Sequence, residues 1–316
     1  MKKLSILKKE YSLFIKVISM VVALISVTFS WFVFGSDAWV NPFDVNVTSV
    51  VDVYISSTDG SDASWSERLE VDTDSATGSI TEFSGNGESL YRPVIVAKEI
   101  QKYYKVDTSD ENINKSYLEI VSYVKSTGPI RFYLHEDSFV VPQDTTNPKD
   151  NIAGAVRVAF LVENHKPFIW APNSTYQYID NQDGTFTVNK NGTPESSYSY
   201  IYEDSEDMFI SKDSLVEIDN SSLKEAGVSQ DKRFVWGDLS KINNYESNAD
   251  PIFTVVHLSQ EEIVVKLTIR VWVEGTDREA IGTLVGGKIN MNLKFNALAV
   301  EERGWFKWKN KRYLQL

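Results

Sequence analysis

Apolar and polar residues alternate along much of the chain beyond residue 43. In segment 44–55 most odd positions hold a valine or isoleucine, and segments 263–273 and 287–297 repeat this alternation over longer stretches. A period of two is typical of a β-strand with one buried face. We predict that 44–55 forms one strand. We also predict that 263–273 and 287–297 pair in one sheet, with their odd-numbered residues on a shared core face.

Shorter runs with the same character extend this pattern over the rest of the chain. Asp183-Gly184 separates two of them and supplies the residues of a tight hairpin turn. Many strands with turn signals between them indicate an all-β protein, and we expect an antiparallel, jelly-roll-like β-sandwich with long loop insertions. The expected strands are 93–98, 117–125, 130–134, 156–162, 176–179, 185–189, 198–202 and 252–258.

Helical signals beyond residue 35 are few. Thr276 and Glu279 form a capping box, and Gly286-Gly287 provides a left-handed stop, so we expect a short helix at about 277–284. The polar stretches 56–86, 142–151 and 204–250 are expected to be surface loops, the last with short helices. We treat 175–250 as a candidate inserted subregion within the sandwich.

The N-terminal segment predicts a membrane-crossing leader. An uncharged run from Val17 through Leu24 to Phe34 follows five lysines. As a helix this run spans about 27 Å, which is close to the thickness of a bilayer core. Lysines on its N-terminal side place that end in the cytoplasm, so the chain after residue 35 is exported. The domains expected are a leader at 1–35, a sandwich at 36–300 and a tail at 301–316.

The fate of the leader is left open between a cleaved signal peptide and a retained anchor. Its length favours an anchor. Small residues at Thr28 and Ser30 nevertheless resemble a cleavage site before Trp31, and Ala38 ends a second, poorer site. Either outcome places the body at the extracellular face of the cell envelope, membrane-anchored or secreted.

Charge and composition narrow the functions of the exported body. The chain carries a net charge of −12, and residues 36–300 hold 22 basic and 41 acidic side chains, a net of −19. Such an acidic surface argues against a nucleic-acid partner. The chain has no cysteine, which excludes disulfides, thiol nucleophiles and cysteine-based metal sites.

Candidate chemistry is sparse. His135, His165 and His257 lie far apart without metal-ligand spacing, and we expect a surface turn at the first and a sheet position at the last. One acidic cluster offers hard oxygen ligands for Ca²⁺, with a solvated acidic loop as the alternative; its members are Glu203, Asp204, Glu206 and Asp207. We expect no other cofactor.

Aromatic residues offer a candidate carbohydrate surface. Trp170, Trp236 and Trp272 are candidates for a sugar platform, with a core position as the alternative for each. A glycosidase also needs a pair of carboxylates in a cleft, and nothing in the sequence selects such a pair. We therefore expect a protein that is not an enzyme.

The tail, residues 301–316, interleaves aromatic and basic residues and has a net charge of +3. This pattern is typical of an interfacial segment attracted to anionic lipid or wall polymer, and the alternative is a final strand with a frayed end. The residues that carry the interfacial interpretation are Trp305, Trp308, Lys309 and Arg312.

Three segments resemble exported proteins of Gram-positive bacteria. Residues 27–32, Val-Thr-Phe-Ser-Trp-Phe, resemble the leader junction of the TasA and camelysin type, and 271–295 and 155–173 are similar to related Firmicutes envelope proteins. The resemblance implies a jelly-roll subunit of biofilm-matrix filaments, in which a strand freed by cleavage completes the next subunit's sheet. The chain departs from it where residues 31–34 continue the apolar run. No catalytic residues are implied.

Three functions follow as expectations. The first is a non-enzymatic, exported envelope protein with a structural or assembly role. The second is a surface binding module for a glycan or small ligand, and the third is an exported hydrolase. The partners expected are the membrane, through the N-terminal helix, and either further copies or other envelope proteins.

Overall fold

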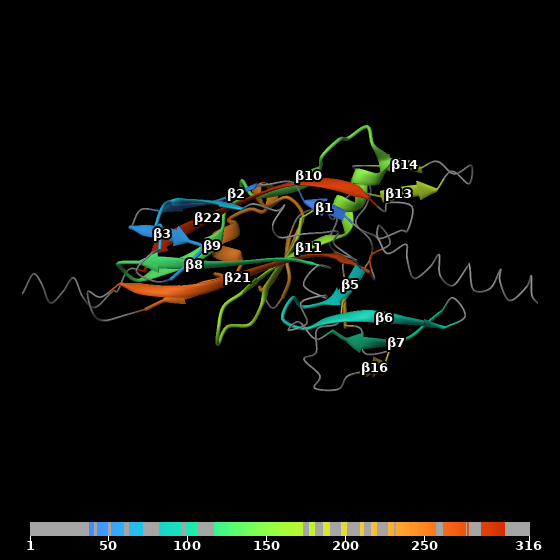
Figure 1. The fold of residues 1–316 in the computed structure, drawn as a ribbon, viewed down its shortest axis with the longest axis horizontal. Coiled ribbons are helices and arrows are strands. Elements are labelled where there is room, and N and C mark those ends of the chain that lie inside the picture. The colour runs from blue at the N-terminus through green and yellow to red at the C-terminus, as the bar shows by residue number, and fades with distance from the viewer. Residues whose placement is uncertain are drawn as a thin grey trace, which may run out of the picture.

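The protein is built almost entirely of β-strands (Figure 1). The computed structural model describes residues 38–40, 43–49, 52–59, 63–71, 82–96, 99–106, 117–172, 177–180, 186–189, 197–200, 209–211, 216–219, 227–230, 232–256, 262–275, 277 and 286–300. The expected all-β class is confirmed. The expected leader helix lies outside the described residues, and so does the expected helix at 277–284 apart from Asp277.

One large sheet is organised around the long strand β22 (Gly287–Ala299), and we call it the β22 sheet. Its main path runs β20-β9-β22-β2-β4, and β1 and β10 also pair with β22. The strands besides β22 are β1 (Ala38–Val40), β2 (Phe43–Ser49), β4 (Arg68–Val71), β9 (Ile130–Leu134), β10 (Phe139–Pro142) and β20 (Phe253–Val255).

The second large sheet is organised around β21 (Ile263–Glu274), and we call it the β21 sheet. Strand β21 pairs with β8 on one edge and with β11 on the other. The other members are β3 (Val53–Ser56), β5 (Glu82–Gly85), β6 (Leu90–Val96), β7 (Glu99–Lys105), β8 (Leu118–Ser126), β11 (Val156–Leu161), β12 (Phe168–Ala171), β16 (Phe209–Ser211), β18 (Gly227–Val228) and β19 (Phe234–Trp236).

The remaining elements are small. Two two-stranded sheets pair β13 (Gln177–Asp180) with β14 (Phe186–Asn189) and β15 (Ser197–Tyr200) with β17 (Val216–Asp219). The first is the predicted hairpin around Asp183-Gly184, which is confirmed. The described helices are η1 (Pro148–Ala155), η3 (Leu239–Lys241) and α2 (Tyr245–Asn248). The last two confirm short helices within 204–250, although that stretch also contains strands.

The prediction that segments 263–273 and 287–297 pair with each other is wrong. They form β21 and β22, which belong to different sheets. Most of their odd-numbered residues are nevertheless buried, including Leu267 and Ile269 on β21 and Leu293 and Phe295 on β22. Ile263 and Val265, at the start of β21, are partly buried against the same core. Alternation specifies which face of a strand is buried, and it does not specify the partner strand.

The prediction of one continuous strand at 44–55 is also wrong. The run forms β2 in the β22 sheet and β3 in the β21 sheet. Val45 and Val47 on β2 and Val53 and Ile55 on β3 are buried, so both halves keep the odd-numbered face toward the core. One alternating run can bend from one sheet into the other and still keep the same face buried, as strands do at the corners of packed sheets.

The sheets are mixed, which corrects the expectation of a purely antiparallel sandwich. Strands β1 and β2 both run parallel to β22. Strand β12 is parallel to β19, and β5 is parallel to β21. The parallel partners are far apart in sequence, so local turn signals do not reveal them.

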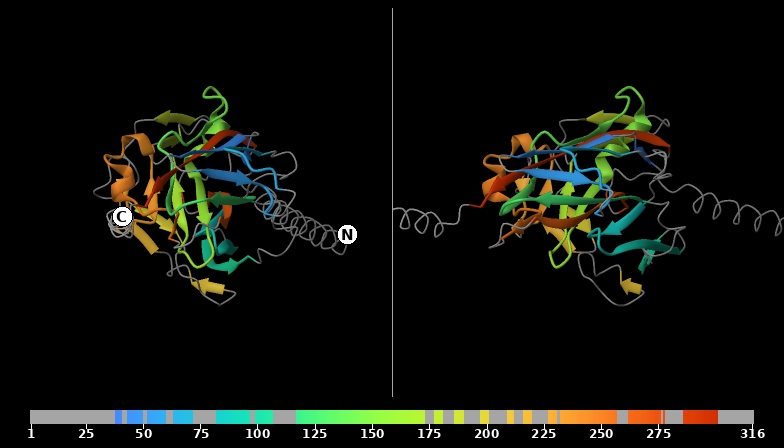
Figure 2. Two further views of the ribbon diagram at one scale, coloured as in Figure 1. Left: turned by 90° about the vertical axis from the view of Figure 1, so that its left-hand side faces the viewer. Right: turned by 60° about the vertical axis from the view of Figure 1, so that its left-hand side comes forward.

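Strands β5, β6, β7 and β16 join the β21 sheet through the short parallel pair of β5 with the end of β21, and they lie below β21 in Figure 1. We call these four strands the outer layer, and Figure 2 shows the molecule from two further directions. The turn before β6 approaches the sheet closely, since a Cβ on Gly87 would lie 2.2 Å from the Ala159 Cβ. Arg270 fixes this turn by donating to the Gly87 carbonyl at 2.7 Å and to Glu119 at 2.6 Å. Trp272, on the outer face of β21, is therefore fully buried.

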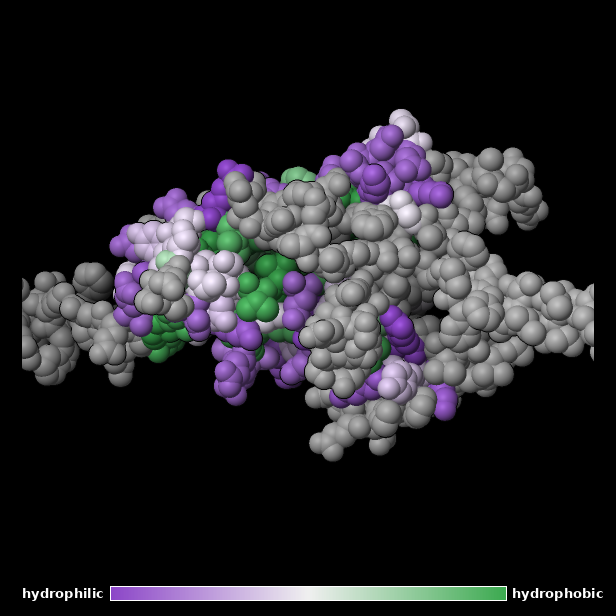
Figure 3. Space-filling model, in the orientation of Figure 1, coloured by the Kyte–Doolittle hydropathy of each residue, from purple (hydrophilic) through white to green (hydrophobic). Residues whose placement is uncertain are grey.

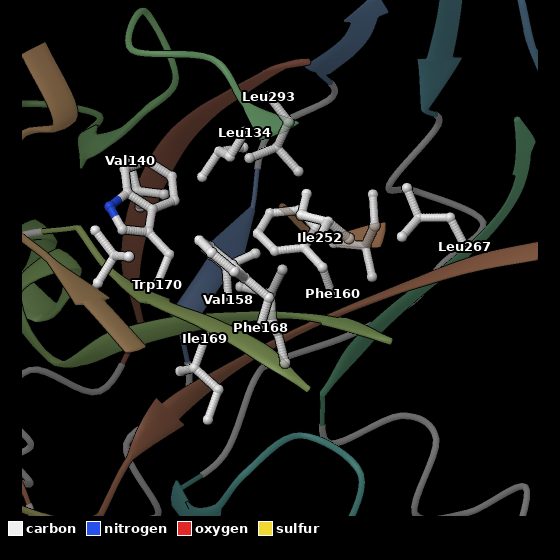
Figure 4. Packing of buried hydrophobic residues seen from close by; sticks show 14 of the residues in the cluster. Leu134, Val140, Val158, Phe160, Phe168, Ile169, Trp170, Ile252, Leu267 and Leu293 are labelled. Carbon is white, nitrogen blue, oxygen red and sulfur yellow. The ribbon is translucent and has the colours of Figure 1, made fainter. Parts of the chain in front are cut away.

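The main core lies between the two large sheets. Apolar side chains reach the surface between the two layers in the view of Figure 3. Figure 4 shows Val158 and Trp170 of the β21 sheet among Leu134 and Leu293 of the β22 sheet. The rings of Phe160 and Phe295 meet edge to face across the sandwich with centroids 5.6 Å apart. Such aromatic packing adds to the area buried between the sheets.

Candidate functional site: the seam between the N-terminal strands and β22

The first described strands run side by side with the last one, and we call this contact of β1 and β2 with β22 the N-terminal seam. Ala38 lies opposite Gly287 and Val40 opposite Ile289. The pairing resumes with Val45 opposite Leu293 and continues to Ser49 opposite Ala297. Both stretches are parallel, so the chain enters the sheet beside the beginning of β22.

The register of the seam changes once. Between Val40 and Val45 the N-terminal segment advances five residues, whereas β22 advances four from Ile289 to Leu293. One extra residue therefore lies between the two paired stretches. Pro42 falls in this interval and has no N–H to donate to a ladder, so the irregular register coincides with a residue that cannot pair there.

Strand β2 is held on both edges. Val45 is fully buried and Val47 nearly so. On the edge away from β22, Phe43 to Asn46 pair with Val71 to Arg68 of β4, and the Val47 amide donates to the Glu67 carbonyl at 2.9 Å. Strand β2 is therefore an interior strand of its own chain's sheet.

The opposite edge of β22 is also occupied, by β9 and β10. Between these two strands the Ser138 hydroxyl accepts from the Lys294 amide and donates to the Lys294 carbonyl, both at 3.0 Å. The His135 amide donates to the same carbonyl at 2.8 Å. A side chain thus replaces the missing strand partner, and β22 is a central strand along its length.

The beginning of β22 is fixed by a buried carboxylate. Asp150 of η1 is 1% exposed and accepts from the Lys288 amide and the Asp144 amide, each at 2.9 Å. The oxygen that accepts from the Lys288 amide, Oδ1, also accepts from the Asn147 side-chain amide at 2.7 Å. Gly287 lies against the same segment, because a Cβ there would be 2.1 Å from the Lys149 carbonyl oxygen. These contacts hold the end of the seam where β1 enters.

Surface carboxylates near the seam are stabilised in their charged form. Lys294 bonds to Asp137 at 2.9 Å and lowers the pKa of that carboxyl, and hydrogen bonds from Thr146 lower the pKa of Asp144. Both carboxylates are exposed. Because their pKa values are lowered, both groups are deprotonated at neutral pH and have no proton to donate.

A buried polar cluster lies at the far end of β21. Arg157 pairs with Asp277 at 2.5 Å, with both side chains about 5% exposed or less. Glu274 accepts from the Trp272 indole at 3.2 Å. Burial, together with the Glu274 carboxylate, raises the pKa of Tyr103 to about 12. Arg157 and Asp277 offset each other's charge, and Glu274 lies close enough to Tyr103 of β7 to act on its pKa.

An aromatic and lysine patch lies on the outer face of the β21 sheet. The Lys125 ammonium is 5.0 Å from the centre of the Trp65 ring and 5.7 Å from that of Tyr54. Glu262 contacts the same ammonium at 3.4 Å, and the neighbouring Val264 is 42% exposed. Sequence reasoning missed this patch because Trp65 lies in a polar stretch interpreted as a loop, and the register of β3 with β8 creates the cluster.

Most predicted site residues lie outside the described residues. Ala38, the second candidate cleavage position, is described and is the first residue of β1. His135 is in a turn after β9, as expected, and His257 is outside the description. The others outside it are Val17, Leu24, Ser30, Phe34, Glu203, Asp204, Glu206, Asp207, Trp305, Trp308, Lys309 and Arg312.

The described part of the chain offers neither a metal site nor a membrane-crossing helix. Within it, no three histidine, aspartate or glutamate side chains group as a metal site. Among the same residues, none of the helices has the length and apolar character needed to cross a membrane.

Of the two interpretations of Trp170, Trp236 and Trp272, the sugar platform is excluded by their burial. Each side chain is at most 1% exposed. Trp170 faces the core and donates its indole N–H to the Gly237 carbonyl at 3.0 Å, while Trp272 is covered by the outer layer. The alternative interpretation of these residues as core positions is confirmed.

Comparison with known proteins adds no assignment, because no family model, curated protein or solved structure matches the chain significantly.

Proposed function

We propose that this chain is an exported, non-enzymatic structural protein of the cell envelope, displayed on the extracellular face and held there by its retained leader. The N-terminal seam is the observation that supports the proposal. The strand that follows the leader is an integral part of the sandwich, with β2 between β22 and β4.

The connection between the leader and the sandwich is short, so a retained leader keeps the sandwich close to the membrane. Four residue steps separate Phe34, at the end of the apolar run, from Ala38 in β1. Even fully extended, four residues reach only about 14 Å. A retained leader therefore holds the sandwich directly at the membrane surface. Because β1 pairs with β22, the anchor connects to the central strand of a sheet rather than to a loose linker.

The seam also bears on assembly. With β2 in its own sheet, the sandwich is closed without a neighbour. Exchange of β1 and β2 between copies would use the same backbone pairs and is the assembly variant that the family resemblance implies. Cleavage after Ser30 would leave β1 intact, whereas cleavage after Ala38 would remove its first residue. We favour anchored display because the apolar run continues past Ser30 to Phe34.

Anchoring is tested by membrane flotation and N-terminal sequencing of the native protein, compared with Ser30→Leu, which removes the small residue before the cleavage position. We expect both proteins to float with membranes, to resist salt extraction and to keep residues 1–35. A soluble wild-type protein that begins at Trp31, alongside a membrane-bound Ser30→Leu variant, would contradict the proposal.

A glycan-binding module is the second candidate, supported by the patch of Tyr54, Trp65 and Lys125. Half-exposed rings beside a cation and an acid can stack on sugar faces and bond to hydroxyls. Affinity electrophoresis in gels that contain cell-wall glycan tests it. Under this candidate, wild-type protein is retarded and Trp65→Ala is not, while Phe139→Ala, which removes an exposed ring from β10 of the β22 sheet, behaves as wild type. Equal mobility of all three with and without glycan would exclude this role.

A further inference from the structure

Tension along the chain would load the N-terminal seam in shear. Strands β1 and β2 run parallel to β22, and β1 begins beside Gly287, the first residue of β22. The chain leaves β22 at its other end, after Ala299. A pull on the chain before β1 and an opposite pull on the chain after β22 therefore draw the two sides of the seam past each other along the strand axis. Figure 1 shows β1 near one end of β22 and β2 farther along it.

Shear distributes the load over the whole seam. Three residue pairs join β1 to β22, and five pairs join β2 to β22. The hydrogen bonds of a parallel ladder are evenly spaced, so a pull along the strands loads them together. A pull across the strands from one end loads the first bonds alone and opens the ladder one pair after another. The seam therefore resists tension between its two outer ends better than it resists peeling from one end.

Buried side chains oppose sliding of β2 along β22. Val45 is fully buried and Val47 nearly so, and they lie opposite the fully buried Leu293 and Phe295. Because neighbouring residues of a strand face opposite sides, a register slip of one residue would turn both valines out of the core. A slip of two residues moves them by about 6.6 Å past side chains that fill the core. No nearby register can therefore replace the native one under load.

The path of the tension through the molecule is short. Tension that enters at β1 crosses the seam to β22 and leaves after Ala299, so the strands between residues 50 and 286 lie outside this path. Strand β22 is held on its other edge by β9 and β10, and Asp150 fixes its start. Strand β2 is held on its other edge by β4. While the seam holds, the strands between 50 and 286 bear little of the tension.

We propose that the N-terminal seam is a mechanical clamp, which carries tension between the membrane side of the chain and the chain beyond Val300 and protects the sandwich from unfolding under that tension. This inference rests on the proposed anchored display, because the retained leader supplies the attachment on the membrane side. A displayed protein experiences such tension whenever an object bound beyond Val300 is drawn away from the cell.

Single-molecule force spectroscopy of the full chain in detergent tests the clamp. The chain has no cysteine, so pairs of introduced cysteines fix the points where DNA handles attach. Ser36→Cys/Ala299→Cys loads the seam in shear, whereas Ser36→Cys/Lys288→Cys peels it from one end; Ala299 and Lys288 are both exposed on β22. At equal pulling speed, we expect the force of the first rupture to be at least about twofold higher in shear. Equal forces in the two geometries would overturn the inference.

A pair of matched substitutions separates the clamp from overall stability. Val45→Ala shortens a fully buried valine of β2 at the seam, and Val158→Ala shortens a fully buried valine of β11 in the β21 sheet. We expect comparable losses of stability in urea unfolding, and a lower shear force for Val45→Ala alone. A similar fall of the shear force in both variants would show that the force follows global stability, which contradicts a clamp at the seam.

Failure of the proposed function gives a different result. The pulling experiment in detergent needs no membrane attachment, and flotation of the native protein needs no clamp. A shear force well above the peeling force, in a protein that does not float with membranes, would support the clamp and contradict anchored display alone. Equal forces in a protein that does float would contradict the clamp alone.

Discussion

Gly286 and Gly287 stand side by side at the start of β22 and serve different purposes. Gly286 has φ of +81°, a conformation that other residues rarely adopt, and a Cβ there would meet open space. Gly287 is needed because the Lys149 carbonyl lies where its Cβ would be. Next to it, Asp150 binds the Lys288 amide. Single residues thus determine how β22 meets η1 and β1.

We predict that Gly287→Ala destabilises the protein by about 2 kcal/mol, because the added methyl group must displace backbone rather than a flexible side chain. Gly128→Ala is the control, since a Cβ at that glycine has no neighbour within 4 Å. Urea unfolding of both variants measures the difference. A Gly287→Ala protein as stable as Gly128→Ala would show that η1 moves away from β22 without penalty.

We predict that Asp150→Ala lowers the free energy of unfolding by about 2 kcal/mol or more, because buried amides lose a charged acceptor. Asp52→Ala removes a carboxylate from an exposed position and should change stability by less than about 0.5 kcal/mol. Chemical denaturation of the two variants is the measurement. Equal effects would mean that the carboxylate does not organise the seam.

We predict an alkaline loss of stability that depends on Tyr103. Its folded pKa is raised to about 12 from 10, so the native state prefers the neutral phenol. This stabilisation is complete below pH 10 and is lost as the pH rises toward 12. Two pKa units correspond to about 2.7 kcal/mol. Melting temperatures between pH 9 and 12 should fall less steeply for Tyr103→Phe than for wild type, with Tyr104→Phe as the control. Parallel curves for all three would contradict the cause assigned here.

The sequence predicts one of these residue-level features at the start of β22 and does not reveal the other two. Gly286-Gly287 was recognisable as a left-handed stop, and the positive φ of Gly286 agrees. The close approach at Gly287 was not predictable, because it depends on η1, which comes more than a hundred residues earlier. Asp150 is one of 44 acidic residues, and nothing local marks it as buried.

At the scale of elements, the alternation of apolar and polar residues predicts which face of a strand is buried. It does not predict which strand lies beside it. Strands β21 and β22 both turn most of their odd-numbered residues toward the core, as expected, yet they lie in different sheets. Strands β2 and β3 share one alternating run and are likewise divided between the sheets. Short strands within polar segments, such as β4 and β5, carry too few apolar residues to be distinguished from loops. The Trp65 patch was missed for the same reason.

Because neighbouring residues of β22 face opposite sides of the sheet, a charge should affect stability very differently at two adjacent positions. Leu293→Asp places a charge at a fully buried position and should destabilise the protein by several kcal/mol, a large part of the roughly 5–15 kcal/mol that holds a domain folded. Asn292→Asp, one residue earlier on the opposite face, should cost about 1 kcal/mol or less. Secreted yield and thermal melting report both. Similar losses from the two variants would mean that the register of β22 is wrong.

At the scale of the whole molecule, the proposed function depends on where the first and last strands lie in the sandwich. Strand β1 beside β22 and strand β2 between β22 and β4 make a sandwich that uses its own N-terminal strands. The proposal of anchored display rests on this arrangement. The sequence indicated export and an all-β body. It did not reveal that the first strands pair with the last, because a contact between residues some 250 positions apart leaves no local trace.

Crosslinking across the N-terminal seam decides whether the first strands complete the sheet of their own chain or that of a neighbour. Thr48 lies opposite Asn296, and the chain has no other thiol to interfere with Thr48→Cys/Asn296→Cys. A short bifunctional thiol reagent is applied to the protein in membranes, and the products are separated by denaturing electrophoresis. The account predicts an internally crosslinked monomer of 35.8 kDa. A ladder of covalent multimers, with little crosslinked monomer, would show that the N-terminal strands fill a neighbour's sheet and would contradict the account.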